Sequence, residues 1–195
     1  CWGSIEVNFL KNLSDIRIAI AGDLHGAWSQ DDLDLLLELN PDGVLFVGDL
    51  SDGDLRIARA ISKISIPTSL IPGNHDRGQD RSGDILKAQL DLLGEKNCSW
   101  NLSKWKLNEL SVVGARPCSA GGGFFMAPEV KEVFGEVSLD ESVNRIVSAV
   151  KQAPLDSPLL ILAHSGPVGL GSESSSPCGR DWKLPSMDWG DKDLG

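Results

Sequence analysis

Short apolar runs alternate with helical patterns through the first half of the chain, and each run leads into a glycine. The runs at residues 16–21, 43–47 and 68–71 have the length and aliphatic content of buried strands. Between them, apolar residues recur at helical spacing from the N-cap Ser29 to Asn40, from Ile57 to Ile64 and from Ile85 to Leu93. This rhythm predicts βαβ units with covered parallel strands, and therefore an α/β fold.

The second half of the sequence has a different pattern. It predicts two antiparallel strands joined through Asn108-Glu109, a glycine loop, a capped helix, one more buried strand and a long final loop. The two strands are residues 99–107 and residues 110–115, and the glycine loop is Gly121–Gly123. The helix begins at the capping box of Ser138 and Glu141, the last strand is residues 158–163, and the final loop is residues 165–195. Such a long loop either lines a functional site or precedes more of the domain beyond Gly195. We expect one domain over residues 16–195 and a residual segment at residues 1–15.

The charge balance argues against one large class of function. Lys and Arg total 18 and Asp and Glu total 28, which gives a formal net charge of −10. A protein that holds DNA or RNA by its backbone needs clustered basic residues, so we expect no such partner. The longest aliphatic run, residues 159–163, is far shorter than the ~20 residues that span a bilayer, so we expect no membrane partner either.

The number and spacing of the cysteines indicate the redox environment in which the protein works. Four cysteines (Cys1, Cys98, Cys118 and Cys178) are too scattered for a disulfide scaffold or a paired-cysteine metal site. We therefore expect free, buried thiols in a reducing environment. The sequence begins with Cys1 and carries no secretory signal, so we expect a soluble intracellular protein whose native N-terminus is missing or processed.

Polar residues gather where the predicted strands end. The three early strands lead into Gly22–Gly26, Gly48-Asp49 and Gly73–Asp76, and the late strand leads into His164–Pro167. About 25 residues separate the first three segments from one another, close to the ~30 residues of one βαβ unit. Equal spacing places these segments at the carboxyl edge of one sheet, which is where α/β proteins bind ligands.

The residue types in these segments suit a metal centre. Asp23 and His25 are two positions apart, so both side chains can point to one side near a strand end. Asp49 has two oxygens with which to bridge two ions, and Asn74 and His164 offer an amide oxygen and an imidazole to the second ion. Each segment alone would be ordinary turn chemistry. All three histidines of the chain nevertheless lie within these segments, and that conjunction predicts a site for Zn, Fe or Mn.

In identity, order and placement, these segments resemble the motifs of the calcineurin-like metallophosphoesterases. The resemblance covers residues 16–167, and residues 112–117, 127–135, 163–171, 177–182 and 188–194 are similar to a branch of that family found in cyanobacteria and plants. It implies a metallophosphoesterase-type four-layer α/β/β/α sandwich with mixed sheets, incomplete at the C-terminus. It also implies a soluble protein of the cytoplasm or the plastid.

The resemblance assigns a role to each matching residue. Asp23 and His25 would bind the first of two divalent ions, Asp49 would bridge, and Asn74 and His164 would bind the second. His75 would be the general acid beside the leaving group, and Asp76 would orient His75. A phosphate ester would be the substrate of such a centre, with water activated for attack on phosphorus. Our candidate phosphate contacts are Arg77 and Arg180, and surface arginines are the alternative for both.

The sequence departs from the family pattern in one respect. That pattern closes with a Gly-His-x-His motif that gives each metal another ligand, and no histidine follows His164 here. We expect a truncated chain, with a natural short form as the alternative. The open function alternatives are a non-catalytic binding module on the same scaffold and an inactive fragment. A nucleotide-binding loop at Gly121–Gly123 is set aside, because no Gly-Lys-Ser/Thr follows these glycines.

Overall fold

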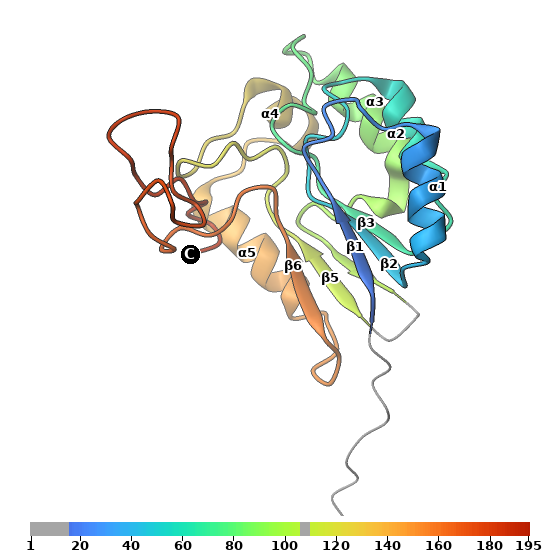
Figure 1. Ribbon diagram of the computed structural model, residues 1–195. Coiled ribbons are helices and arrows are strands. Elements are labelled where there is room, and N and C mark those ends of the chain that lie inside the picture. The colour runs from blue at the N-terminus through green and yellow to red at the C-terminus, as the bar shows by residue number, and fades with distance from the viewer. Residues whose placement is uncertain (1–15, 106–109) are drawn as a thin grey trace, which may run out of the picture.

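The computed structural model describes residues 16–105 and 110–195 (Figure 1). Its elements are β1 (Ile18–Ala21), α1 (Gln30–Leu39), β2 (Gly43–Phe46), α2 (Leu55–Ser62), β3 (Thr68–Leu70), α3 (Asp84–Leu93), a 3₁₀ turn (Gly94–Lys96), β4 (Leu102–Lys104), β5 (Ser111–Gly114), α4 (Pro128–Phe134), α5 (Leu139–Val150) and β6 (Leu159–Leu162). The N-terminal segment 1–15 and the Asn108-Glu109 connection lie outside the described residues.

The first sheet confirms the predicted βαβ rhythm. Its strands lie in the order β1-β2-β3, and both pairs are parallel, so all three carboxyl ends meet at one edge. Helix α1 begins after Ser29 as predicted, because Ser29 and Asp32 form a reciprocal capping box. Helices α1 and α2 cover one face of this sheet, where a buried cluster includes Leu36, Val44, Phe46, Ile57, Ile61 and Leu70.

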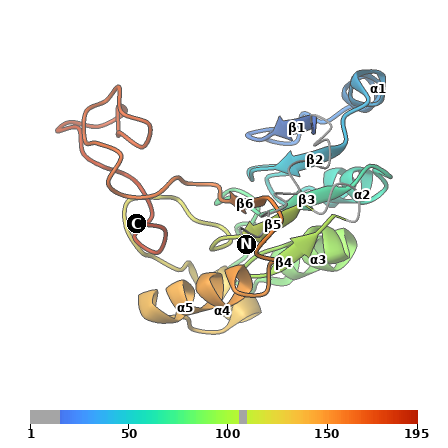
Figure 2. The ribbon, with the colours of Figure 1, turned by 90° about the horizontal axis from the view of Figure 1, so that it is seen from below.

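The second sheet is mixed. Strand β5 lies between β4, which is antiparallel to it, and β6, which is parallel to it. One shared core joins the first sheet, the second sheet and the helices α3, α4 and α5; it includes Leu45, Ile71, Leu86, Val112, Val113, Val130 and Ile146. Figure 2 shows α1 at one end of this stack and α4 and α5 at the other. The layers therefore follow the expected α/β/β/α order.

Two elements differ from the sequence-based expectation. Helix α4 was not predicted, because its seven residues are too few for a clear period and its N-cap, Ala127, makes no side-chain cap. Strand β6 was expected to be buried, and this was wrong: Leu159 and Ile161 are 37% and 47% exposed. Periodicity cannot distinguish a central strand from an edge strand, and β6 lies at the edge of its sheet.

The described cysteines agree in part with the prediction of free, buried thiols. Cys98 and Cys118 are free and buried, as predicted, and Cys178 is free and half-buried. Burial raises the pKa of the Cys98 thiol to about 12, so this thiol is protonated and unreactive at neutral pH.

Across the described parts of the chain, none of the helices combines the length and apolarity that crossing a bilayer requires.

A buried ion-pair network fixes the final loop. The guanidinium of Arg116 donates to Asp191 at 2.6 Å and to Asp193 at 3.1 Å, and all three side chains are almost fully buried. Ser119 donates a further hydrogen bond of 2.6 Å to Asp191. Paired buried charges of this kind hold a segment in one position, because separating them would leave uncompensated charges in the interior. The loop over residues 165–195, red in Figure 1, is therefore anchored to the segment that follows β5.

Candidate metal centre

Backbone hydrogen bonds hold the loops after β1 and β2 together beyond the ends of the strands. The amide of Asp23 donates to Gly48 O at 3.0 Å, and the amide of His25 donates to Asp49 O at 2.9 Å. Asp23, His25 and Asp49 have left-handed φ angles of 50°, 45° and 50°. Non-glycine residues seldom adopt this conformation, and those that do concentrate at functional sites. The two loops thus present their polar side chains at the carboxyl edge, where the sequence predicted them.

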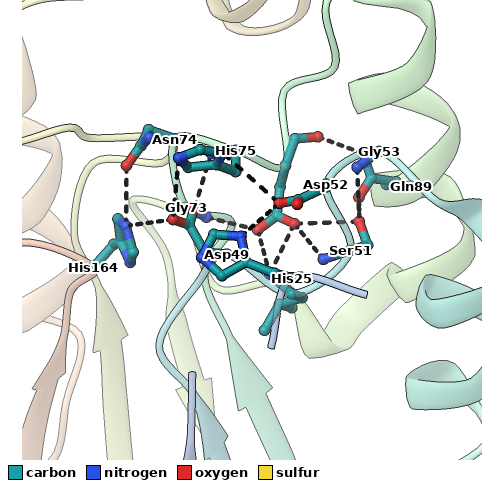
Figure 3. A network of polar contacts seen from close by, with 12 residues as sticks. His25, Asp49, Ser51, Asp52, Gly53, Gly73, Asn74, His75, Gln89 and His164 are labelled. Carbon is teal, nitrogen blue, oxygen red and sulfur yellow. Dashed lines mark hydrogen bonds and ion pairs between the residues drawn. The ribbon is translucent and has the colours of Figure 1, made fainter. Parts of the chain in front are cut away.

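Asp49, Asn74 and His164 converge at this edge (Figure 3). His164 Nε2 lies 3.2 Å from Asn74 Oδ1 and 3.4 Å from Asp49 Oδ2. His164 Nδ1 lies 2.8 Å from Val47 O, and because a carbonyl only accepts, Nδ1 carries the proton in this bond. In the neutral ring, Nε2 then directs its lone pair toward two oxygens. A metal ion placed among these atoms would accept the Nε2 lone pair and lone pairs of both oxygens, so these three residues fit a metal ion.

Asp23 belongs to the same group. One ligand atom from each of Asp23, Asp49 and His164 lies within 4.8 Å of the others, and Asp49 is buried while Asp23 is exposed. Two carboxylates and an imidazole form an oxygen and nitrogen donor set, which suits Zn, Fe or Mn. The side chain of the central ligand is therefore shielded, and the site opens to solvent on the Asp23 side.

A second group consists of His25, Asp52 and His75. His25 Nδ1 donates to Asp52 Oδ1 at 2.9 Å, and His75 Nδ1 lies 3.8 Å from the same oxygen. The rings of His25 and His75 meet edge to face, with centroids 4.9 Å apart. The sequence reasoning missed Asp52. Its signal was a second acidic residue within the Gly48–Gly53 turn, which ordinary turn chemistry also explains.

Asp76 contacts the backbone of the site loops, while the sequence predicted that it would orient His75. Its carboxylate is buried and accepts hydrogen bonds from the amides of Leu50, Ser51 and Gly73 at 2.8–2.9 Å. Asp76 thereby ties the loop after β2 to the loop after β3. It is Asp49 that contacts the His75 segment directly, since Asp49 Oδ1 accepts from the His75 amide at 2.8 Å.

Two glycines leave the space that the ligands occupy. A Cβ atom on Gly73 would lie 2.2 Å from Asp49 Oδ1, and one on Gly48 would lie 2.7 Å from His164 Nδ1. Gly48 also has a φ of 99°. Any side chain at either position would displace a candidate ligand, so these glycines are requirements of the site.

The ion pair between Asp49 and His164 changes the pKa of both groups. Burial alone would raise the pKa of Asp49, but hydrogen bonds from His164 and the His75 amide outweigh it and lower the pKa. Burial alone would lower the pKa of His164, but the Asp49 carboxylate outweighs it and raises the pKa above 6.5. The hydrogen bond to Asp52 likewise raises the pKa of His25 above 6.5. Both imidazoles are therefore stabilised in the cationic form until a metal ion displaces the proton.

The two candidate phosphate contacts lie in different surroundings. Arg77 is half-buried in the loop that carries His75. Arg180 is buried in the final loop, donates from Nη2 to Pro185 O at 2.7 Å, and lies over the ring of Trp189 at 4.9 Å. Its guanidinium is therefore packed and bonded through Nη2, while its buried Nε has no hydrogen-bond partner among the described residues.

Comparisons with known proteins agree with this architecture. TT1561 of Thermus thermophilus superposes with a TM-score of 0.57 and 16% identity, over 92% of this chain and 75% of that protein. A second crystal structure superposes with a TM-score of 0.52 and 13% identity, over 91% of this chain and 77% of its own. Among proteins with curated functions, none matches the chain significantly. A family model described as calcineurin-like phosphoesterase matches residues 16–188, and the chain belongs to that family.

Proposed function

We propose that this protein is a metal-dependent phosphoester hydrolase with a dinuclear centre, acting as a phosphatase or phosphodiesterase. The observation that carries the proposal is the convergence of Asp49 Oδ2, Asn74 Oδ1 and His164 Nε2 beside an exposed second group of donors. Two divalent ions held there would supply activation of water and neutralisation of phosphoryl oxygens, which suits a chain with a net charge of −10.

The chain's own residues would divide the work of holding the ions. Asp49 would bridge, because its carboxylate lies between candidate ligands of the two ions: ligand atoms of Asp23, Asp49 and His164 all lie within 4.8 Å of one another. Asn74 and His164 would complete one position. Asp23 and His25 would complete the other position. Asp52 would hold the His25 ring by accepting a hydrogen bond from Nδ1, which leaves the Nε2 lone pair free to bind the ion.

His75 would act as the general acid. Its side chain is 54% exposed and stands between the carboxylates of Asp49 and Asp52, at the open side of the site. An exposed imidazole in that position can donate a proton to a leaving alkoxide without serving as a ligand. Arg77, in the same loop as His75, is our candidate contact for a phosphoryl oxygen.

Removal of the bridging carboxylate tests the proposal. We expect Asp49→Asn to lose both ions and all hydrolysis, while Asp23→Asn weakens chiefly one ion. Asp34→Asn, which alters an exposed carboxylate on α1 that accepts from Gln30, is the matched control. Metal content and hydrolysis of an aryl phosphate with Mn²⁺, Fe²⁺ or Zn²⁺ are the measurements. Two ions retained by Asp49→Asn would refute the bridging role.

The non-catalytic alternative predicts a different outcome of the same measurements. A binding module would take up metal and phosphate, lose both on chelation, and yet release no alcohol from any ester. The resemblance to the family suggests that a Gly-His-x-His segment would supply two more ligands. Joining such a segment to this chain should raise metal affinity and turnover together if the protein is a hydrolase.

A further inference from the structure

An aromatic pocket adjoins the metal centre through His164. It has a volume of about 220 Å³ and is lined by residues 164–166, residues 177–179, Trp182 and Trp189. Apart from His164, none of these residues is ionisable near neutral pH. Pockets that enclose drug-sized ligands measure ~300–1,000 Å³, so this one has room for a single ring.

The glycine loop, Gly121–Gly123, packs directly against Trp189, which forms one wall of this pocket. A Cβ atom on Gly121 would lie 2.6 Å from Trp189 Cδ1, and one on Gly122 would lie 2.8 Å from the six-membered ring of Trp189. The φ angles of these glycines, 69° and 71°, are left-handed as well. Trp189 Nε1 donates to Ala120 O at 2.8 Å, and the Trp189 amide donates to Cys178 O at 2.7 Å. Trp189 is thus a rigid surface whose polar atoms are already paired.

Trp182, in contrast, is open to solvent. Its side chain is 65% exposed, and its ring meets Trp189 edge to face with centroids 5.4 Å apart. Arg180 covers the Trp189 ring with its guanidinium 4.9 Å from the ring centroid. A large aromatic surface left exposed beside a preformed pocket is costly in water, and a flat ring is the partner that the exposed Trp182 indole favours, since Arg180 already covers one face of Trp189.

We propose that this pocket binds the organic group of the substrate, and that the substrate class is phosphoesters carrying an aromatic or heteroaromatic ring. The proposal rests on the proposed function, because the phosphoryl group would be held at Asp49, Asn74 and His164. The ring then lies beyond His164 against Trp182 and Trp189. Trp182 is accordingly a specificity residue and takes no part in the chemistry.

Paired phosphonates that cannot be hydrolysed test this inference. Benzylphosphonate and cyclohexylmethylphosphonate have the same charge and similar size, and they differ in aromaticity. Calorimetric titration of the Zn²⁺-loaded protein should show benzylphosphonate binding about two- to tenfold more tightly. Trp182→Leu should abolish this difference, and Trp182→Phe should retain it. Phe125→Leu should retain it too, because Phe125 is 66% exposed and does not line the pocket.

Three results would overturn the inference: equal affinities in the wild type, a preference that survives Trp182→Leu, or binding of neither phosphonate. Hydrolysis of benzyl phosphate and cyclohexylmethyl phosphate, whose leaving groups are both alkyl alcohols, is measured separately. An aromatic preference in binding without any hydrolysis would refute the proposed function and leave the pocket assignment standing. Hydrolysis of both esters without an aromatic preference in binding would support the proposed function and refute the pocket assignment.

Discussion

At the scale of single residues, the proposed mechanism assigns metal binding and proton transfer to different histidines. His164 and His75 come from the ends of different strands and differ in exposure: 12% of the His164 side chain is exposed, against 54% of His75. A buried imidazole with Nδ1 fixed by a carbonyl is suited to hold an ion. An exposed imidazole is suited to meet a substrate. In the proposed mechanism, the exposure of each histidine side chain therefore decides whether it binds an ion or donates a proton.

Replacing His75 by Asn tests this division. We expect turnover to fall by ~10²–10⁴-fold while metal content is unchanged, because a general acid is removed and no ligand is lost. The loss should be larger for phenyl phosphate than for 4-nitrophenyl phosphate, since the poorer leaving group needs the proton more. Metal analysis and steady-state rates on both esters measure this. Loss of metal, or equal losses on both esters, would contradict the role.

From the ion pair of Asp49 and His164 we expect pH to affect two quantities differently: the stability of the metal-free protein and its affinity for metal. The raised pKa of His164 contributes stability to the metal-free protein that is complete below pH 6.5 and is lost as pH rises through the folded-state pKa. The lowered pKa of Asp49 contributes stability above pH 3.8 that is lost as pH falls through its folded-state pKa. Metal binding instead requires neutral His164, so metal affinity should fall as pH drops through the His164 pKa.

Thermal unfolding at pH 5.5 and pH 8, with EDTA and with Zn²⁺, measures both responses. The increase in unfolding temperature produced by Zn²⁺ should be larger at pH 8. In His164→Gln, which retains a polar side chain without a titratable group, the pH dependence of that increase should be much weaker. A Zn²⁺ effect that is independent of pH in the wild type would contradict the assignment of His164 as a metal ligand.

At the scale of elements, Asp76 joins the ends of β2 and β3. Its buried carboxylate accepts from three backbone amides in two loops, and Gln89 of α3 also donates to its carbonyl oxygen. We expect Asp76→Ala to destabilise the fold by about 3 kcal/mol or more, because buried donors lose their acceptor. Metal affinity should fall with it, since these loops carry Asp49 and Asn74. The exposed carboxylate of Asp91 on α3 provides the control variant, Asp91→Ala. Chemical denaturation that shows equal stability for the two variants would refute this role of Asp76.

The first sheet and its site loops could be predicted from the sequence because local signals there agree with one another. Residues 16–21, 43–47 and 68–71 are short, largely apolar runs, each followed within two residues by a glycine, and the capping residues of α1 and α5 stand where the helices begin. Parallel pairing then placed Asp23, Asp49 and Asn74 at one edge by topology alone.

What could not be predicted depends on contacts between distant segments. Asp76 and Asp52 are acidic residues in turns, and only the fold shows that one binds amides of two loops while the other binds His25. The glycines at 121 and 122 are explained by Trp189, which follows them by more than 60 residues. The aliphatic run of β6 gave no indication that the strand would lie at a sheet edge.

At the scale of the whole molecule, two sheet edges carry exposed aliphatic side chains. In residues 16–105 and 110–195, β1 pairs only with β2 and β6 pairs only with β5. Ile20 of β1 is 67% exposed, and Ile161 of β6 is 47% exposed. An unprotected strand edge with aliphatic side chains is a template for pairing with another chain.

We therefore expect this chain to self-associate in a concentration-dependent manner through the β6 edge, and Ile161→Lys to reduce the association by placing a charge on that edge. Leu155→Lys is the matched control, because Leu155 is fully exposed in the turn before β6 and belongs to no strand. Sedimentation equilibrium at several concentrations measures the effect. If edge pairing drives association, Ile161→Lys shifts the equilibrium toward monomer and Leu155→Lys does not. A wild type that is monomeric at all concentrations, or equal shifts in both variants, would contradict the prediction, because general surface apolarity would then account for whatever association is seen.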